Sequence, residues 1–137
     1  MDLGRAVGAN PRLVPHVTEI TDALRPFLAA HPNARVVWVE EYARAVVDGV
    51  AHRAGFAALT ADALVLTWRH GAFYRKRSEA LVRRADVVSW RATGDGVLIS
   101  TADGEVAVAF RPGGPERTDF VDRLTLGRAL GPQASPD

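Results

Sequence analysis

The sequence predicts an α+β domain: a small antiparallel β-barrel or sandwich of about six or seven strands, with a helix before the strands and a capping helix after them. Three observations lead to this fold class. Apolar residues recur at helical spacing over 17–28, short apolar runs alternate with turn residues over 35–110, and a second amphipathic stretch follows a break at 111–115.

The first part of the chain is expected to hold one helix behind a flexible tail. Residues 1–14 show no periodicity and contain Gly4, Gly8 and Pro11, so we expect a tail there. The next apolar residues share one helical face: Val17, Ile20, Leu24, Phe27 and Leu28. Pro26 lies inside this pattern and lacks an N–H, which predicts a kink or two short helical pieces ending near 31–33.

The middle of the chain is expected to be a series of strands. Residues 35–40 open with Val-Val-Trp-Val and predict a strand, whereas 41–50 fit either a strand or a helical face, with the strand favoured. Residues 55–69 indicate two strands joined by a tight turn at Asp62, and 80–92, with Leu81, Val87, Val88 and Trp90, indicate one or two more. Residues 97–110 form the plainest hairpin, because Asp103-Gly104 suits the positive φ angles of its turn.

The end of the chain is expected to form a capping helix. Pro115 suits a first helical position, and Phe120, Val121 and Leu124 form an apolar stripe beside the supportive pair Asp119 and Arg123. The predicted organisation is therefore a tail at 1–14, a single domain over 15–131 and a flexible tail at 132–137.

Composition restricts the class of protein. A length of 137 residues suits one domain, and 47% hydrophobic with 24% charged residues is typical of a globular chain. The absence of cysteine excludes disulfides, thiolate nucleophiles and cysteine-type zinc sites. No apolar stretch suits a signal peptide or a membrane span, so we expect a cytoplasmic protein, peripheral at any membrane it touches.

A basic segment stands out from a nearly neutral chain. The net charge is +1, yet residues 69–91 hold seven basic and two acidic residues. Within it, the loop expected at 70–84 reads HGAFYRKRSEALVRR. Arginine pairs with phosphate through two hydrogen bonds, and aromatic rings enter lipid interfaces or stack on bases. The candidate anion- or partner-binding residues are Arg75, Lys76, Arg77, Arg83, Arg84, Phe73 and Tyr74.

A solvated loop is the competing interpretation of this segment. One lysine against sixteen arginines, with many alanines, indicates a GC-rich coding bias, so arginine abundance alone is weak evidence for phosphate binding.

No constellation for catalysis is present in the sequence. Glu40 and Glu41 are adjacent, and neighbours on a strand point to opposite faces. The four histidines are not spaced as metal ligands, and the serines lack a nucleophile context. We therefore expect no catalytic residues, no metal and no cofactor, and we expect Trp38, Trp68 and Trp90 to pack in the core or at its rim.

The chain resembles the bacterial pleckstrin-homology-like (PH/GRAM-type) domains over roughly residues 17–130. GFAALTADALVLT at 55–67 is similar to a hairpin of that family, ADVVSWRA at 85–92 to the following strand, and GVLISTADGEVAVAF with FVDRL at 120–124 to the last hairpin and closing helix. One departure is Ala63, where the family's hairpin typically carries arginine.

The resemblance implies a β-barrel closed at one end by the C-terminal helix, and a binding module instead of an enzyme. Basic loops of eukaryotic relatives hold phosphoinositide head groups. We therefore expect a non-catalytic module, monomeric or homodimeric, that engages a protein partner or an anionic, phosphate-bearing surface through 70–84. The alternatives are a nucleic-acid-binding domain that uses the same residues with Trp90, and an enzyme or small-ligand pocket in the barrel.

Overall fold

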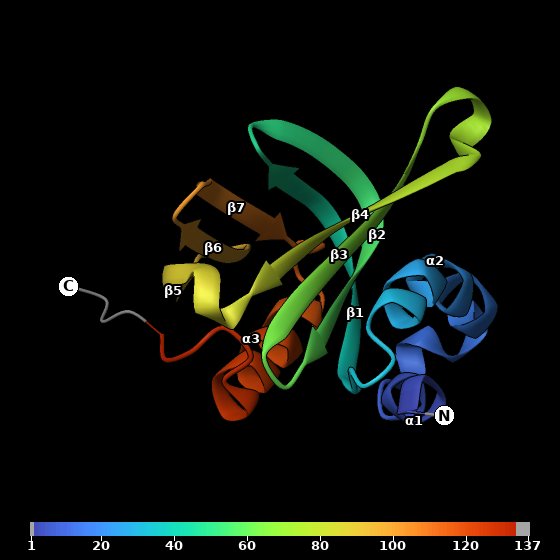
Figure 1. The fold of residues 1–137 in the computed structure, drawn as a ribbon, viewed down its shortest axis with the longest axis horizontal. Coiled ribbons are helices and arrows are strands. Elements are labelled where there is room, and N and C mark those ends of the chain that lie inside the picture. The colour runs from blue at the N-terminus through green and yellow to red at the C-terminus, as the bar shows by residue number, and fades with distance from the viewer. Residues whose placement is uncertain (1, 134–137) are drawn as a thin grey trace.

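A computed structural model describes residues 2–133 and has the predicted order of helix, strands and helix (Figure 1). The N-terminal part contains α1 (Asp2–Gly8), the 3-10 helix η1 (Pro11–His16) and α2 (Val17–Ala30). The strands are β1 (Val36–Val47), β2 (Val50–Thr60), β3 (Ala63–His70), β4 (Lys76–Arg83), β5 (Val87–Ala92), β6 (Gly96–Thr101) and β7 (Gly104–Ala109). Short 3-10 turns η2 (Ala72–Tyr74) and η3 (Arg84–Asp86) flank β4, and α3 (Glu116–Gly127) follows β7.

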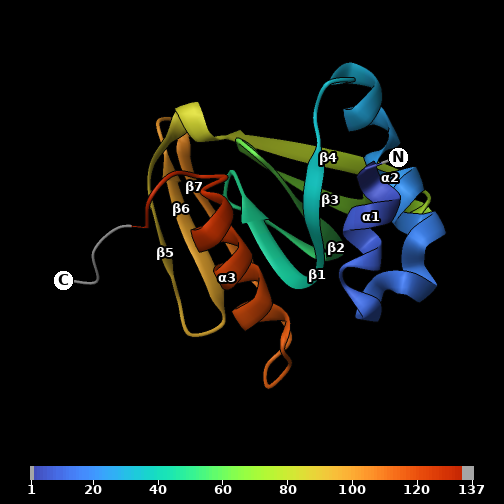
Figure 2. The same ribbon diagram turned by 90° about the horizontal axis from the view of Figure 1, so that it is seen from below.

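The strands form one antiparallel sheet of seven strands in the order β4-β3-β2-β1-β7-β6-β5. The sheet folds over so that the half made by β1–β4 faces the half made by β5–β7, and α3 lies across an open end between them (Figure 2). β4 and β5 end the strand order, so the sheet does not close on itself. The α+β class and the antiparallel architecture are confirmed.

Two apolar cores lie on opposite faces of the β1–β4 half. The inner core fills the folded sheet under α3, and its large side chains include Trp38, Tyr42, Trp90, Phe110 and Phe120. The outer core joins the other face of β1–β3 to the N-terminal helices through Leu3, Leu13, Ile20, Leu24 and Phe27. The β1–β4 half is therefore covered on both faces.

The flexible tail expected at 1–14 is wrong for residues 2–14, which form α1 and most of η1. Leu3, Val7 and Leu13 are buried in the outer core. A helix as short as α1 is unstable alone and forms because it packs, so sequence periodicity cannot reveal it. At the other end, the indole Nε1 of Trp90 donates to the carbonyl of Gly131 at 2.8 Å. Residues 1 and 134–137 lie outside the described residues. Most of the tail expected at 132–137 therefore also lies outside them.

Helix α2 is a single helix with Pro26 inside it, so of the two expected alternatives, a kink or two short pieces, the second is wrong. Pro26 removes one backbone hydrogen bond and costs about 3 kcal/mol in a helix interior. The face of α2 buries Ile20, Leu24 and Phe27. Each fully buried side chain of this size contributes about 1.5–3 kcal/mol, so packing outweighs the proline.

Residues 41–47 continue a strand, as favoured from the sequence, and a turn at 48–49 separates it from the next strand. β1 runs to Val47, and β2 starts at Val50. The turn between them is Asp48-Gly49, with φ angles of 53° and 78°. This is the turn that an Asp-Gly pair favours in a two-residue hairpin, and it excludes the alternative of a continuous helix.

The β1–β2 hairpin needs a glycine where it crosses β3. Gly55 pairs with Tyr42, whose hydroxyl donates to the carbonyl of Thr67 at 2.6 Å. A Cβ at position 55 would overlap both the Thr67 carbonyl oxygen and the Tyr42 hydroxyl. Gly55 therefore permits the close approach that fixes β1, β2 and β3 together.

Candidate functional site

The segment 70–84 is mostly a strand, so the expected loop is wrong. β4 pairs with β3 along its whole length, from His70 opposite Lys76 to Ala63 opposite Arg83. The side chain of Val82 enters the inner core and that of Leu81 packs on the outer core. Successive side chains of β4 therefore face opposite cores. The sequence does not show this pattern, because charged residues occupy both ends of the strand. The only loop is the short connection 71–75 at the tip.

The β3–β4 hairpin projects from the body of the protein (Figure 1). Its tip holds the aromatic residues Phe73 and Tyr74 of η2. Phe73 is 86% exposed and Tyr74 is 65% exposed. Both have positive φ, 56° and 53°, after Gly71 at 80°. For a bulky residue this conformation is rare and costs about 1–2 kcal/mol. The turn therefore holds two aromatic rings in water in a strained conformation.

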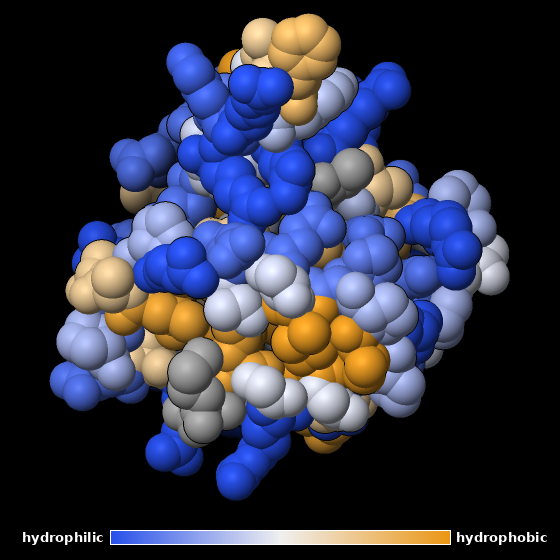
Figure 3. All heavy atoms as spheres, turned by 90° about the vertical axis from the view of Figure 1, so that its right-hand side faces the viewer, coloured by the Kyte–Doolittle hydropathy of each residue, from blue (hydrophilic) through white to orange (hydrophobic). Residues whose placement is uncertain are grey.

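Basic residues surround these rings. The Arg75 guanidinium lies 5.6 Å from the centre of the Phe73 ring, and Lys76 has no ion-pair partner among the described residues. The stretch 68–78 contains Arg69, Arg75, Lys76 and Arg77 and no carboxylate. In Figure 3, hydrophilic residues crowd the hairpin at the top of the view, with an apolar side chain at its summit.

The structure does not bring the five candidate cations together. Arg75 and Lys76 lie at the tip, whereas Arg83 and Arg84 lie at the other end of β4. Seven residue steps at about 3.3 Å separate Lys76 from Arg83 by roughly 23 Å. Arg84 donates to the carbonyl oxygens of Ala61 at 3.5 Å and Arg128 at 3.4 Å, which ties the end of α3 to the sheet.

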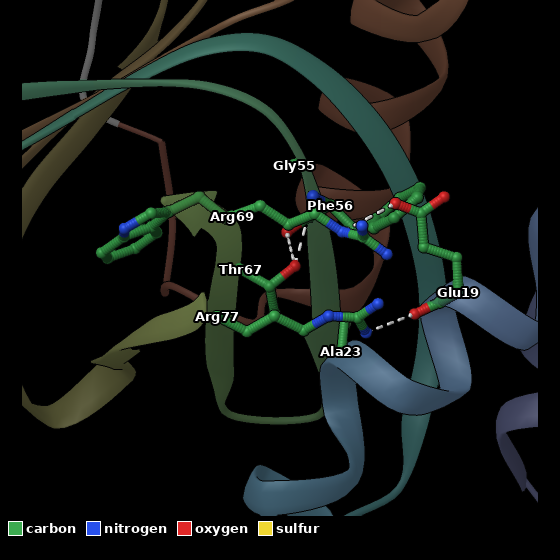
Figure 4. A pocket seen from close by; sticks show the side chains of 8 residues that line it. Glu19, Ala23, Gly55, Phe56, Thr67, Arg69 and Arg77 are labelled. Carbon is green, nitrogen blue, oxygen red and sulfur yellow. Dashed lines mark hydrogen bonds and ion pairs between the residues drawn. The ribbon is translucent and has the colours of Figure 1, made fainter. Parts of the chain in front are cut away.

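Arg77 has a structural role beside the tip (Figure 4). It pairs across the strands with Arg69, an arrangement of like charges that is unfavourable by itself. Glu19 of α2 relieves it: its carboxylate lies 3.4 Å from Arg69 Nε, and its backbone carbonyl accepts from Arg77 at 3.2 Å. The space beside these residues is about 10 Å³, room for roughly one water. The two arginines therefore fasten the hairpin to α2.

The inner side of the hairpin brings together side chains that sequence reasoning did not place beside one another. The rings of His52 and Trp68 stack at 4.0 Å, with 16° between their planes. Nε2 of His70 lies 2.7 Å from Oγ of Ser78. The register places Trp68 opposite Ser78 and His70 opposite Lys76, so the contact of His70 with Ser78 is diagonal across the two strands. The sequence offered no signal of this contact, because 70–84 was expected to be a loop.

Glu40 belongs to a buried polar cluster far from the tip. Its carboxylate accepts from Asn10 Nδ2 at 2.9 Å and from Arg12 Nη2 at 2.7 Å. The same Arg12 atom lies 2.9 Å from Asp119 of α3. Burial raises the pKa of Glu40 in spite of Arg12 and Asn10. Because its neighbour Glu41 is exposed, the two acids do not act together. Glu40 of β1 instead binds Arg12 of η1, which in turn contacts Asp119 of α3.

No metal site is formed by the histidine, aspartate and glutamate side chains of residues 2–133. Within the same residues, the helices are too short or too polar to cross a membrane.

No protein-family model matches the sequence, and no curated protein matches it. A solved structure with a similar fold is the crystal structure of the C-terminal domain of an unknown protein from Leishmania infantum. The TM-score is 0.59 at 7% sequence identity, and the match covers 80% of this chain and 98% of that one. The likeness is one of fold alone.

Proposed function

We propose that this chain is a non-catalytic, PH-like binding module that attaches to an anionic membrane surface through the tip of the β3–β4 hairpin. The PH-like assignment is supported by a folded seven-stranded antiparallel sheet with one helix across an open end, the architecture that the sequence resemblance implies. A fold alone does not define a function, so the surface carries the argument.

The exposed pair Phe73 and Tyr74 is the observation that carries the proposal. Large aromatic side chains are normally at least half-buried, whereas these two stand at the end of a projecting, strained turn. Aromatic rings favour the boundary between lipid chains and head groups. Arg75 and Lys76, next to them in the chain, would then lie at the depth of the lipid phosphates.

The expected attachment is weak and reversible. Each cation at an anionic surface contributes about 1 kcal/mol, so Arg75 and Lys76 together contribute about 2 kcal/mol. Partial burial of Phe73 and Tyr74 adds about 2–4 kcal/mol. A total of about 4–6 kcal/mol corresponds to half-saturation between about 1 mM lipid and some tens of micromolar.

Vesicle sedimentation tests the proposal. We expect capture by vesicles of phosphatidylcholine with phosphatidylserine and little capture by phosphatidylcholine alone, decreasing as salt is raised. The variants Phe73→Ser/Tyr74→Ser and Arg75→Glu/Lys76→Glu should each lose capture. The control Arg83→Glu/Arg91→Glu makes the same charge change on exposed residues away from the tip and should bind as the parent does.

Two results would contradict the proposal. Equal loss in the tip variants and in the control would mean that net charge alone attracts the protein. No capture by anionic vesicles would reject membrane attachment. Under that second result, a salt-sensitive gel shift with RNA or DNA that the tip variants abolish would favour nucleic-acid binding.

A further inference from the structure

Strands β4 and β5 form the two edges of the sheet, and the edges differ in shape. β4 pairs with β3 in one continuous register over its eight residues. β5 has six residues, and its register against β6 shifts between Val87 and Ser89, which makes Val88 a bulge. A bulge bends an edge strand away from further pairing, whereas a long and regular edge is open to another strand. β4 is therefore the edge that can accept one.

The backbone groups that β4 leaves unpaired belong to its odd-numbered residues. The N–H of Arg84 donates to the carbonyl of Asp62 at 2.8 Å, and these two residues continue the β3–β4 register. In an antiparallel ladder, pairs that share such bonds alternate with pairs that share none. The even-numbered residues of β4 therefore bond to β3, and the backbone groups of Glu79, Leu81 and Arg83 point away from the sheet. Among the described residues these groups have no backbone partner.

The side chains beside this edge form a short pattern of acid, apolar residue and base. Glu79 and Arg83 are exposed on either side of the half-buried Leu81. Neither charged side chain has an ion-pair partner within the part of the chain that the structure describes. Leu81 and Arg83 also line a groove of about 480 Å³ that reaches Phe27 of α2, so there is open space on the outer face beside the edge.

A second copy of β4 matches this pattern. Outward-facing residues must lie opposite outward-facing residues, so an antiparallel pair of β4 strands is centred on a single residue of each copy. Centring it on Leu81 sets Leu81 opposite itself and Glu79 opposite Arg83 twice. Centring it on Glu79 sets two carboxylates opposite each other, and centring it on Ala80 sets Arg77 opposite Arg83 twice. Opposite charges directly across a ladder stabilise it, and like charges destabilise it.

A register centred on Ser78 also joins opposite charges, because Arg77 would lie opposite Glu79. Arg77, however, already donates to a backbone carbonyl of α2 at 3.2 Å. The same register moves Leu81 opposite Arg75, which lies outside the strand. The register centred on Leu81 is therefore the favoured one.

We infer that a second copy of this chain binds along β4, antiparallel and centred on Leu81, so that the two sheets become one continuous sheet. Glu79 of each copy then pairs with Arg83 of the other on the outer face. The same patch serves both copies, as a closed two-fold dimer requires. The hairpin tips point in opposite directions and stay outside the ladder, so the inference does not depend on the proposed membrane attachment.

Sedimentation velocity of the full chain, from about 10 µM to about 1 mM, tests the dimer. The parent should shift from monomer to dimer within this range. Glu79→Arg and Arg83→Glu should each weaken the dimer by about fourfold or more, because each sets like charges opposite one another at two places. An equimolar mixture of these two variants should regain the dimer, since the acids of one variant then lie opposite the bases of the other. The controls Glu105→Arg and Arg91→Glu change exposed residues outside β4 and should dimerise as the parent does.

Isotope-filtered NMR of a mixed-label dimer determines the register. In the proposed register Ala80 and Val82 form the pair without hydrogen bonds, whose Cα atoms lie about 4.5 Å apart, so we expect a contact between their α-protons across the two copies. A register centred on Ser78 would instead bring the two Ser78 α-protons together. The inference is overturned by a parent that is monomeric at about 1 mM, or by a dimer that Glu79→Arg and Arg83→Glu leave unchanged. A mixture of these two variants that stays monomeric, or a different register, would overturn it equally.

Discussion

Replacing Arg12 by leucine tests how the N-terminal segment is held to the sheet. Arg12 Nη2 contacts both Glu40 and Asp119, and without it the buried Glu40 carboxylate keeps only the Asn10 amide. Removing one partner of a buried ion pair typically costs about 3–5 kcal/mol. Arg12 is 31% exposed, so water can reach the vacated space. We therefore expect a loss near the lower limit, about 3 kcal/mol, from a total stability of about 5–15 kcal/mol.

Urea unfolding at pH 7 of the parent, Arg12→Leu, Glu40→Leu and the double variant measures this loss. The double variant has no unpaired buried charge at position 40, so it should recover at least half of the loss seen in Arg12→Leu. In Arg12→Leu the pKa of Glu40 rises further, because the cation that favours its charged form is gone. The loss should accordingly shrink when the pH is lowered below 4.5, the ordinary value for a glutamate, where Glu40 is protonated in both states. A loss under about 1 kcal/mol at pH 7, or strictly additive losses in the double variant, would refute this account.

Two further predictions concern the core of the sheet and the titration of Glu40. Gly55→Ala should destabilise the protein by about 2–3 kcal/mol, because the added methyl group collides with the Thr67 carbonyl and displaces the Tyr42 hydroxyl. The loss should appear as a lower midpoint of urea unfolding. Unchanged stability would contradict the close approach of β2 to β3 at Gly55. Burial raises the folded-state pKa of Glu40 above 4.5, so the folded protein binds more protons there than the unfolded chain does. The stability of the parent relative to Glu40→Gln should therefore fall as the pH rises from 4.5 through that raised pKa, and a parallel pH dependence of the two proteins would argue against it.

Much of the fold follows from local patterns in the sequence. The alternation in 55–69 and 97–110, with Asp62 and Asp103-Gly104 at the turns, corresponds to four of the seven strands. These patterns are readable because one face of each strand contacts a core. The helices α2 and α3 could be predicted for the same reason, because the residues that each buries recur at helical spacing.

The rest depends on contacts between residues distant in the sequence. Helix α1 forms only against the outer face of the sheet, so its seven residues look like a tail. The arginines of 70–84 look like one patch, but strand geometry sends Arg83 and Arg84 away from the tip. Opposite directions on a strand already separate Glu40 from Glu41, but the actual partners of Glu40, Asn10 and Arg12, lie about thirty residues earlier in the chain.

The two cores also divide the molecule into parts of unequal rigidity. To separate the strands of the β1–β4 half, the chain must give up apolar contacts on both faces at once. The β5–β7 half contributes to the inner core alone, and its edge strand β5 leaves Val88 73% exposed while Trp90 holds the strand to that core. The projecting hairpin grows from the rigid half and is fastened by Glu19 to a helix behind it. A force applied at the tip is therefore passed, through the contacts of Glu19, to the half of the sheet that is covered on both faces.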